Sequence, residues 1–339
     1  MKRYYLFFTL LLLIFALQRV MAQGSNQAIT YEELYDDPYA INKLFVHLQP
    51  LYAELFKTNV NAGFGAAINY YHENKFNLHA HYRQAYFKSF DFARDVALKN
   101  QEIENRPDNF NFFEAGGTYH IKDLEADTET KLVLYSKTYQ KGNRWAAKVP
   151  EHTVVPSKVR KIIGGRLGGW SYNTSADLNR IMKDQGVGLV DQDSVAMPGG
   201  VYVNGNMSVF GGFLGGSMSW IKNMAIKPDK GYGVLSDDQI LTAYFDIVLA
   251  PAISIDDIEY KDPDADFRRR VFSADPVNTN MFGFRAGLEG KYNRELGWSY
   301  GLETGIRPGI KGRGFYAAFK VSFPVYSTNL NYEREAFGK

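Results

Sequence analysis

The sequence predicts an all-β protein in which about twelve antiparallel strands, within a range of eight to fourteen, form a meander that closes into a barrel. Two observations predict this fold. Apolar and polar residues alternate with period two over stretches longer than the roughly five to six residues of an ordinary strand. The composition is rich in residues that favour strands and turns, with 23 Tyr, 24 Phe and 31 Gly among 339 residues.

The N-terminus is predicted to be a secretory signal peptide. Lys2 and Arg3 precede a long apolar run, and small residues lead up to Ala22, which is the usual order of the three parts of such a peptide. We therefore expect residues 1–22 to be removed near Ala22 after export. Residues 23–43 are then expected to form a segment in the periplasm.

The composition argues against several classes of protein. Cysteine is absent from the sequence, which argues against a disulfide framework, a thiolate metal site and a lipoprotein anchor. No later run approaches the roughly 18 apolar residues that a membrane helix needs. The net charge is +2, from 39 basic and 37 acidic residues, so no overall field favours nucleic acid. We therefore expect no nucleic-acid partner, and no cofactor is predicted.

Two-faced strands are clear near the start of the mature chain. Residues 59–71 alternate between apolar and small or polar side chains, and residues 75–87 do the same. In the second segment, Leu78 and Tyr82 fall on one face and His81 falls on the other. Only three residues join the two segments, which predicts a tight hairpin.

The C-terminal part repeats this pattern in three consecutive segments, at 280–292, 297–307 and 313–326. In the last of them, Phe319 alternates with Lys320 and the pattern continues on both sides. Short links between the segments predict an antiparallel meander.

The same pattern along the whole chain predicts a barrel at 44–326 and a tail at 327–339. An even number of strands is the rule for single-chain bacterial barrels. The segment 145–154 has the weakest pattern and is kept because its removal would make the number odd. Strands are expected at 44–56, 59–71, 75–88, 109–122, 129–140, 145–154, 158–172, 205–222, 239–253, 280–292, 297–307 and 313–326.

The length and polarity of these strands favour a transmembrane barrel over a soluble sandwich. Strands that cross an outer membrane need about 9–11 residues, an apolar face toward lipid, a polar face toward the lumen, and aromatic girdles at both interfaces. Aromatic residues near the ends of the predicted strands are candidates for the girdles: Tyr70, Tyr71, Tyr82, Trp170, Trp220, Trp298, Tyr300 and Tyr326.

The lengths of the connections point the same way. With both termini in the periplasm, long loops are expected on the extracellular side, at 89–108, 173–204 and 254–279. Short turns are expected on the periplasmic side, at 72–74, 123–128, 155–157 and 293–296. The link 223–238 is longer than a periplasmic turn should be.

Together these features resemble a Gram-negative bacterial outer-membrane β-barrel protein, over most of the mature chain and at the level of architecture. The resemblance implies a location in the outer membrane and contact with outer-membrane lipids. Such proteins usually end on a strand with a terminal aromatic residue. Here Phe323 and Tyr326 close the last strand, and a tail that contains Phe337 follows.

Charged residues on the polar face of the strands are candidate lumen residues. Opposite charges on neighbouring strands, such as Arg285 or Glu289 with Glu303 or Arg307, are expected to neutralise one another. This pairing fills a narrow barrel, whereas in an open barrel the arginines form a constriction that favours anions. The candidates are Arg83, Glu114, Arg160, Arg166, Asp246, Arg285, Glu289, Glu303, Arg307 and Lys320.

A GGxLGG pattern occurs twice, at 164–169 and at 211–216, each time before a tryptophan. A strand follows each pattern in place of a helix start, which argues against a phosphate loop. The glycines permit strong coiling of the sheet, or they form a docking strip for a lipid or a partner protein. The alternation leaves open which face the strip occupies. It consists of Gly164, Gly165, Gly168, Gly169, Gly211, Gly212, Gly215 and Gly216.

A histidine pair and a charged loop are two further candidate binding sites. His79 and His81 project to one side of a strand, but no third ligand can be assigned, so they are interpreted as lumen polar residues and no metal site is predicted. The loop 254–279 is acidic and then contains Arg268, Arg269 and Arg270 in succession. It is expected to be a solvated surface loop, whose arginines are candidates for binding lipopolysaccharide phosphates or a partner.

The functional prediction is an integral outer-membrane barrel that acts as a structural or docking subunit of an outer-membrane complex, without catalysis. Its candidate partners are other outer-membrane or periplasmic proteins. A narrow porin-like diffusion channel with a charged lumen is the first alternative. A lipid-modifying enzyme is the second, and no local catalytic signature supports it.

Overall fold

The computed structural model describes residues 30–72, 75–88, 102–134, 151–229, 233–262, 268–293 and 297–328. The predicted signal peptide and most of the predicted tail lie outside these residues. Among the described residues, no helix has the length and apolar character needed to cross a membrane.

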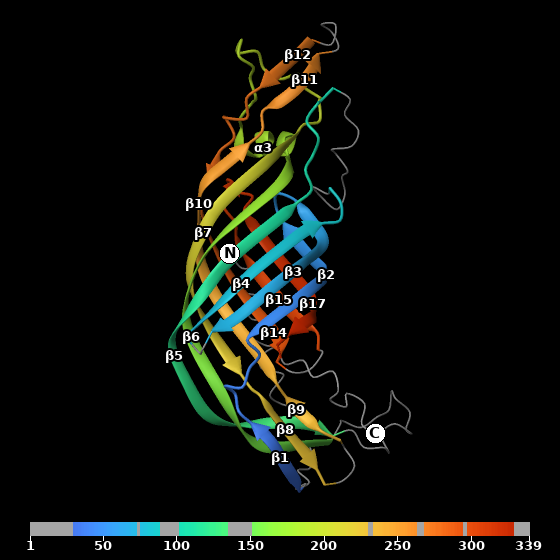
Figure 1. The fold of residues 1–339 in the computed structure, drawn as a ribbon. Coiled ribbons are helices and arrows are strands. Elements are labelled where there is room, and N and C mark those ends of the chain that lie inside the picture. The colour runs from blue at the N-terminus through green and yellow to red at the C-terminus, as the bar shows by residue number, and fades with distance from the viewer. Residues whose placement is uncertain are drawn as a thin grey trace, which may run out of the picture.

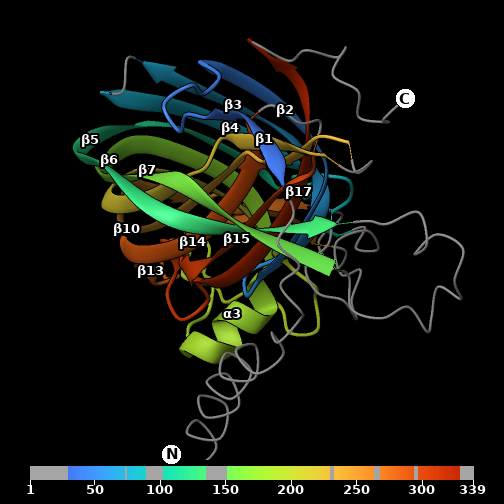
Figure 2. The ribbon, with the colours of Figure 1, turned by 90° about the horizontal axis from the view of Figure 1, so that it is seen from below.

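Ten antiparallel strands form a closed barrel, which confirms the predicted all-β meander (Figure 1). Each strand pairs with its neighbours along the meander, and β17 pairs with β2 to close the ring. Seen from one end, the strands surround a single interior (Figure 2). They are β2 (Leu44–Phe56), β3 (Val60–His72), β4 (Phe76–Ala85), β5 (Asn111–Leu134), β6 (Glu151–Asp177), β7 (Asn204–Ile221), β10 (Gln239–Ile255), β14 (Phe282–Tyr292), β15 (Ser299–Ile306) and β17 (Phe315–Ser327).

The expected number of twelve strands is therefore wrong, although ten lies within the predicted range. The segments expected at 109–122 and 129–140 belong to one strand, β5, as far as the chain is described. Those expected at 145–154 and 158–172 likewise belong to β6. The two turns expected at 123–128 and 155–157 instead lie within the paired part of β5 and β6, where Thr128 is opposite Ser157. Pairing between β5 and β6 continues through both segments, and the face of this ribbon that carries Leu132 and Val155 is buried.

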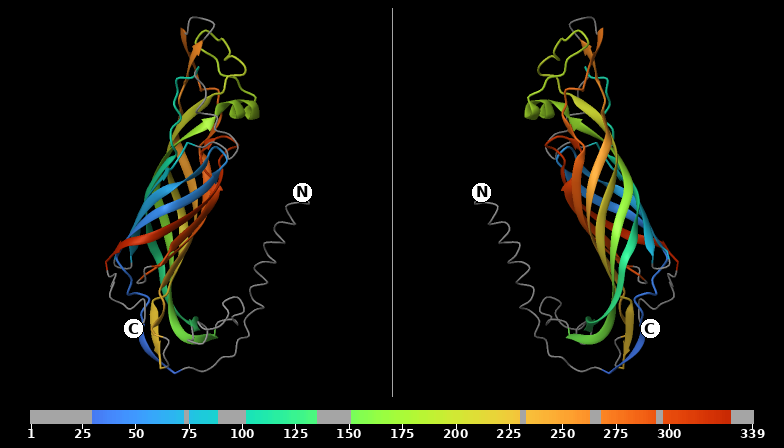
Figure 3. Two further views of the ribbon diagram at one scale, coloured as in Figure 1. Left: turned by 90° about the vertical axis from the view of Figure 1, so that its right-hand side faces the viewer. Right: turned by 90° about the vertical axis from the view of Figure 1, so that its left-hand side faces the viewer.

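The extra length of β5 and β6 extends beyond one end of the barrel (Figures 1 and 3). A small sheet packs there, in the order β1 (Tyr31–Asp36), β8 (Met224–Pro228) and β9 (Leu235–Asp237). Leu132 of β5 and Val155 of β6 share an apolar cluster with Ile226 of β8. The long link at 223–238 is thereby explained, because it contains β8 and β9. We call this sheet together with the β5–β6 extension the platform.

The opposite end of the barrel carries a cap made by the long connections. It includes α3 (Leu178–Gln185), the hairpin of β11 (Ile258–Asp262) and β12 (Arg268–Phe272), and the short pair of β13 (Thr279–Asn280) and β16 (Gly309–Ile310). Asp177 caps the N-terminus of helix α3, because its side chain accepts a hydrogen bond from the Arg180 amide. Gly186, with a φ of 68°, caps the C-terminus. One apolar cluster runs from the barrel interior into this cap.

The outer surface of the barrel is apolar all the way round. Along each strand, most residues that point outward are apolar, while their neighbours in sequence point inward and are small, aromatic, polar or charged. Each of the ten strands contributes at least one exposed apolar side chain to this belt, for example Leu51, Phe64, Leu78, Phe113, Leu167, Leu214, Ile247, Phe284, Leu302 and Phe319.

The aromatic residues expected in the girdles do not all lie on the outer surface. Tyr82, Trp298 and Tyr326 are exposed on the outer surface, at 40%, 63% and 52%. Trp170, in contrast, is only 2% exposed and lies in the interior cluster. It fits there because it faces Gly211, where a Cβ atom would lie 2.9 Å from the indole ring.

Residues 37–43, which precede β2, form a strap that crosses the platform end of the barrel. Asn42 in this strap donates its backbone N–H to the side-chain oxygen of Asn293, at 2.8 Å, just after β14. The side chain of Asn223, just after β7, donates to the carbonyl of Asp37 at 2.7 Å. Because β7 lies opposite β2 in the ring of strands, these contacts hold the strap across the mouth.

Candidate functional site

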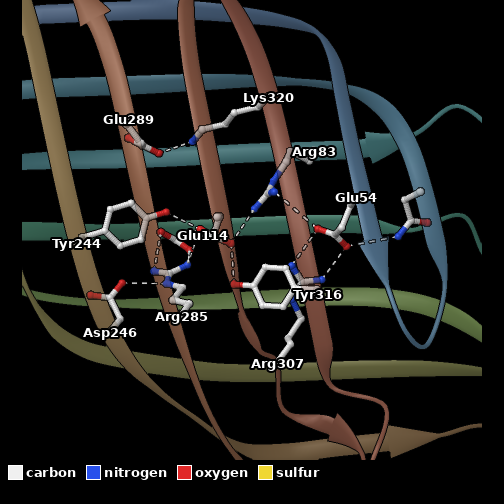
Figure 4. A network of polar contacts seen from close by, with 12 residues as sticks. Glu54, Arg83, Glu114, Tyr244, Asp246, Arg285, Glu289, Arg307, Tyr316 and Lys320 are labelled. Carbon is white, nitrogen blue, oxygen red and sulfur yellow. Dashed lines mark hydrogen bonds and ion pairs between the residues drawn. The ribbon is translucent and has the colours of Figure 1, made fainter. Parts of the chain in front are cut away.

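The predicted lumen charges meet in a network across the middle of the barrel (Figure 4). Arg83, Glu114, Arg166, Asp246, Arg285 and Arg307 are buried, and Glu289, Glu303 and Lys320 are partly buried. Arg160 is also buried, but it lies nearer the platform, where it pairs with Asp123. Strand parity places these charges on the interior face of the barrel.

One half of the network is centred on Arg307. Its two terminal nitrogens donate to the two carboxylate oxygens of Glu54, at 2.9 and 3.0 Å. The guanidinium also lies 4.1 Å from the ring centroid of Tyr316 and 4.9 Å from that of Phe56. Arg83 lies farther from the same carboxylate, at 3.8 Å. The Arg307 guanidinium therefore has a bidentate carboxylate partner and is surrounded by aromatic rings.

The other half is centred on Arg285. It donates to both oxygens of Glu114 and, through Nε, to Asp246 at 2.9 Å. Arg166 donates to the second oxygen of Asp246 at 3.0 Å. Glu114 also contacts His79 Nε2 at 3.1 Å. Two arginines thus share one aspartate across β6, β10 and β14.

Glu303 joins the two halves. The hydroxyl groups of Tyr244 and Tyr316 donate to its two oxygens, at 2.6 and 2.8 Å. Arg285 approaches it to 3.8 Å and Arg83 to 3.9 Å. The network therefore runs continuously from one wall of the barrel to the other.

The partners of these charges differ from those expected in two cases. Glu289 pairs with Lys320 across β14 and β17, and Arg307 pairs with Glu54. Glu54 was not among the predicted lumen charges. Its parity is obscured by an irregularity at Pro50, where the register of β2 shifts between Gln49 and Tyr52. Alternation on each side of Pro50, with a change of phase, is the signal that would have identified it.

Aromatic side chains fill the interior between the network and the cap. Tyr52, Phe110 and Tyr172 are fully buried, and Trp170 stacks on Tyr172 at 5.7 Å between ring centroids. The Tyr172 hydroxyl donates to the carbonyl of Pro308 at 2.6 Å, which ties the packed rings to the turn between β15 and β17. The interior is therefore closed at this level among the described residues.

The glycine strip lies on β6 and β7, which pair along its whole length, and it opens on both faces. Gly164, Gly168, Gly211 and Gly215 face inward, and a Cβ atom on any of them would meet a neighbouring atom within 2.6 Å. At Gly215 that neighbour is the Asp246 carboxylate, at 2.2 Å. Inward glycines therefore make room for the network and the packed rings.

The other four glycines face outward, where a Cβ atom would lie 3.2 Å from the nearest atom at Gly212 and 3.5–3.7 Å from it at the other three. They are paired in register across the two strands, Gly165 with Gly216 and Gly169 with Gly212. A Cβ atom on Gly216 would come no closer than 3.7 Å to another atom. Leu167 and Leu214, both strongly exposed, lie between the two glycine pairs. The apolar belt therefore lacks side chains on each side of Leu167 and Leu214, at the outward glycines.

A polar cavity of about 60 Å³ lies between the network and the strap. Its walls come from the platform half of the barrel and include three histidines together with Arg166, Lys291 and Lys320. An apolar cluster that includes Phe45, Tyr71 and the strap residue Ile41 lies at the same end. The histidines are His47, His79 and His81.

The histidine pair does not form a metal site within the described chain. No group of three or more His, Cys, Asp or Glu residues there is arranged to hold a metal ion. His79 instead contacts Glu114, and its ring centroid lies 5.5 Å from that of His81.

The arginines of the cap are paired rather than free. Arg269 pairs with Glu259, and Arg270 pairs with Asp191 and lies 3.7 Å from Asp262. Burial raises the pKa of Asp191, but the Val195 amide and the Arg270 guanidinium outweigh burial and hold the pKa below its ordinary value of 3.8. Two of the three candidate phosphate ligands therefore already have carboxylate partners.

Comparison of the chain with protein-family models gives no match, and comparison with curated proteins gives none either. The function must therefore be argued from the geometry.

Proposed function

We propose that the chain is an integral protein of the bacterial outer membrane and that it serves as a structural or docking subunit, without catalysis. The apolar belt carries the first part of the proposal. A protein surrounded by water rarely exposes a continuous apolar patch larger than a few hundred Å², whereas this belt includes exposed apolar residues from all ten strands.

The interior supports the same environment. A soluble barrel hides apolar side chains inside and shows polar ones outside. Here the charges of the network lie inside together with packed aromatic rings, and large apolar side chains from every strand face outward. In lipid, the closed ring also provides a partner for the backbone groups of every strand, because it has no edge.

The docking role rests on the contrast between a filled interior and elaborate ends. The network and the packed rings occupy the space that a pore would need. The cap and the platform, in contrast, extend far beyond the belt at opposite ends (Figure 3). A rigid barrel that holds two shaped surfaces on opposite sides of a membrane suits a subunit that joins other proteins.

Single cysteines test the membrane placement, because the chain has none of its own. In intact cells, a membrane-impermeant maleimide should label Arg268→Cys in the cap and should leave Lys131→Cys in the platform unlabelled. Permeabilising the outer membrane should expose Lys131→Cys. Leu214→Cys, in the belt, should stay unlabelled in both states. Labelling of Leu214→Cys as fast as Arg268→Cys would contradict a lipid-facing belt.

Purification from native membranes in mild detergent, read by mass spectrometry, tests the docking role. We expect a partner at a fixed ratio to the barrel. Gly212→Leu with Gly216→Leu should leave the barrel folded and should abolish co-purification if the outward glycines are the docking strip. The matched control is Ala66→Leu with Ala317→Leu, which enlarges outward residues on β3 and β17 instead.

Recovery of the single chain alone from wild-type membranes would contradict the docking role. If the partner is present and persists in both double variants, the outward glycines serve curvature only, and the cap or the platform remains as the docking surface.

A further inference from the structure

The cavity beneath the network contains a cation that no carboxylate neutralises. Lys291 of β14 lies 4.6 Å from the ring centroid of Phe45 and 4.8 Å from that of Tyr71. Lys320, on the same cavity wall, pairs with Glu289. Among the residues that the structure describes, Lys291 forms no ion pair; it contacts the two aromatic rings, and its charge also acts on His47.

The uneven pairing matters because the other interior cations are matched. Arg307 is paired with Glu54, and Arg285 has three carboxylates within 4 Å. Arg166 shares Asp246 with Arg285. A half-buried ammonium group loses part of its hydration, and the faces of aromatic rings replace only a part of what water provides. A negative ion inside the cavity would replace the rest of the hydration that the Lys291 ammonium group has lost.

Three buried polar side chains face the same cavity with an atom that lacks a partner among the described residues. They are His47 at Nε2, Gln49 at Oε1 and Ser299 at Oγ, with 4%, 2% and 8% of the residue exposed. Buried polar atoms in folded proteins nearly always have a hydrogen-bond partner. The cavity is therefore built to hold polar contents.

The size and charge of the cavity indicate which kind of ion it can hold. Its volume of about 60 Å³ is enough for a halide or nitrate ion and the few waters that complete its shell. Glu114 and Glu289 also line the cavity, but Glu114 is held by Arg285 and His79, and Glu289 is held by Lys320. The unmatched charge on the wall is the ammonium group of Lys291.

We propose that this cavity binds one small inorganic monoanion, of the size of chloride or nitrate, with the Lys291 ammonium as its charged ligand. His47, as a neutral imidazole with its proton on Nε2, is the second donor. The site lies on the platform side of the network, so the ion enters and leaves by that end. The proposal requires the folded barrel and is independent of the docking role.

Chloride binding can be measured by the broadening of the chloride-35 resonance in the presence of the full-length mature protein, folded in zwitterionic detergent. At constant ionic strength, nitrate should displace the bound chloride and remove the excess broadening. Gluconate should not, because it is too large for the cavity. Equal displacement by nitrate and gluconate from the wild-type protein would overturn the proposal.

Lys291→Met tests the ligand, because methionine keeps most of the aromatic contact and removes the charge. Loss of a charged hydrogen-bond donor should weaken chloride binding by about tenfold or more. Lys131→Met, which removes an exposed lysine from the β5 extension, is the matched control and should bind as the wild type does.

His47→Leu should weaken binding less than Lys291→Met, because it removes a neutral donor. If Lys291→Met fails to fold, Lys291→Gln takes its place, with the same expected loss. Undiminished broadening in a folded Lys291 variant would mean that chloride meets the surface only or that the cavity holds water alone. Either result would overturn the proposal.

Discussion

At the scale of single residues, Arg307 shows how a charge is kept inside this barrel. Its guanidinium has a bidentate carboxylate partner, and five aromatic rings lie within 6 Å of it. Such a cation is fully compensated only while the Glu54 carboxylate is in place. The stability of the pair therefore depends on both partners being present, and removal of one leaves a buried charge on the other.

We accordingly expect Arg307→Met to destabilise the barrel strongly. Glu54 would keep Arg83, at 3.8 Å, and a long hydrogen bond from Asn61, at 3.5 Å, and loss of one partner of a buried pair costs about 3–5 kcal/mol. Adding Glu54→Gln should restore part of the loss, because the uncompensated charge is then gone. Unfolding in urea, followed by tryptophan fluorescence for the wild type, both single variants and the double variant, measures the coupling. Additive losses would show that the pair is energetically unimportant.

In the cap, Asp191 gives a dependence on pH. Its folded pKa lies below the ordinary value of 3.8, so its contribution to the stability of the cap is fully present above that value. The contribution is lost as the pH falls through the lowered folded pKa. Amide exchange in residues 187–203, corrected for the intrinsic effect of pH, should therefore accelerate in strong acid.

Asp191→Asn is the control for this acid effect. The amide cannot pair with Arg270 as a charge, so the cap should exchange faster at every pH and show no further acid step. An acid step of wild-type size in Asp191→Asn would assign the effect to another group.

The parity of alternating strands was enough to identify most interior charges, because side chains in a strand must point to opposite faces. It failed at Glu54, where the irregularity at Pro50 reverses the phase. It also could not identify the partner of each charge. Glu289 and Lys320 lie on strands that are not adjacent, and only the diameter of the closed barrel decides that they meet.

At the scale of elements, β6 and β7 show why a glycine repeat can have two functions at once. Consecutive glycines necessarily point to opposite faces, so each GG pair supplies one inward and one outward position. The repeat was readable in the sequence, but its two roles were not. They depend on which large side chains, such as Phe213 and the Asp246 carboxylate, come to occupy the space opposite.

Neighbouring substitutions separate these roles. Gly215→Ala should destabilise the barrel by about 1–3 kcal/mol, because its methyl group would lie 2.2 Å from the Asp246 carboxylate and from the Phe245 carbonyl. Gly216→Ala should be close to neutral, since its methyl group would make only an ordinary contact, at 3.7 Å from the Gly164 carbonyl. The midpoints of urea unfolding give the comparison. Equal effects of the two substitutions would contradict the assignment of faces.

The β5–β6 ribbon marks the limit of reading elements from polarity. Within the apolar belt, alternation separates the two faces clearly. Beyond it, charged residues such as Glu125 and Asp127 still alternate with smaller or apolar ones, and the face that carries Leu132 and Val155 is buried. The pairing continues there because β6 still lies opposite β5. A polar stretch without glycine, next to another of matching length, is therefore better interpreted as an extended hairpin than as two turns.

At the scale of the whole molecule, the distribution of polarity bears on the choice between a channel and a scaffold. A diffusion channel needs a continuous water path along its axis. Here the path from the platform reaches the cavity and ends at the network, and the interior beyond it is packed with Tyr52, Phe110 and Tyr172, each with no exposed surface. Closure at this level involves paired charges from most of the strands, so opening would require breaking many contacts together.

The filled interior therefore predicts that the wild-type protein, reconstituted in a planar bilayer, gives no stable conductance steps. The strands cannot widen the ring without losing pairs such as Arg285 with Asp246, and the buried rings leave no room for a hydrated ion. Before the recording, the Leu214→Cys labelling pattern should establish that the protein is inserted. Stable steps would restore the channel hypothesis. In that event, Arg285→Ala together with Arg307→Ala should abolish a preference for anions, because these two guanidinium groups would form the constriction. If the inserted wild-type protein gives no conductance, the scaffold role remains as the proposal. Its functional surfaces are then the cap and the platform, which the barrel holds apart.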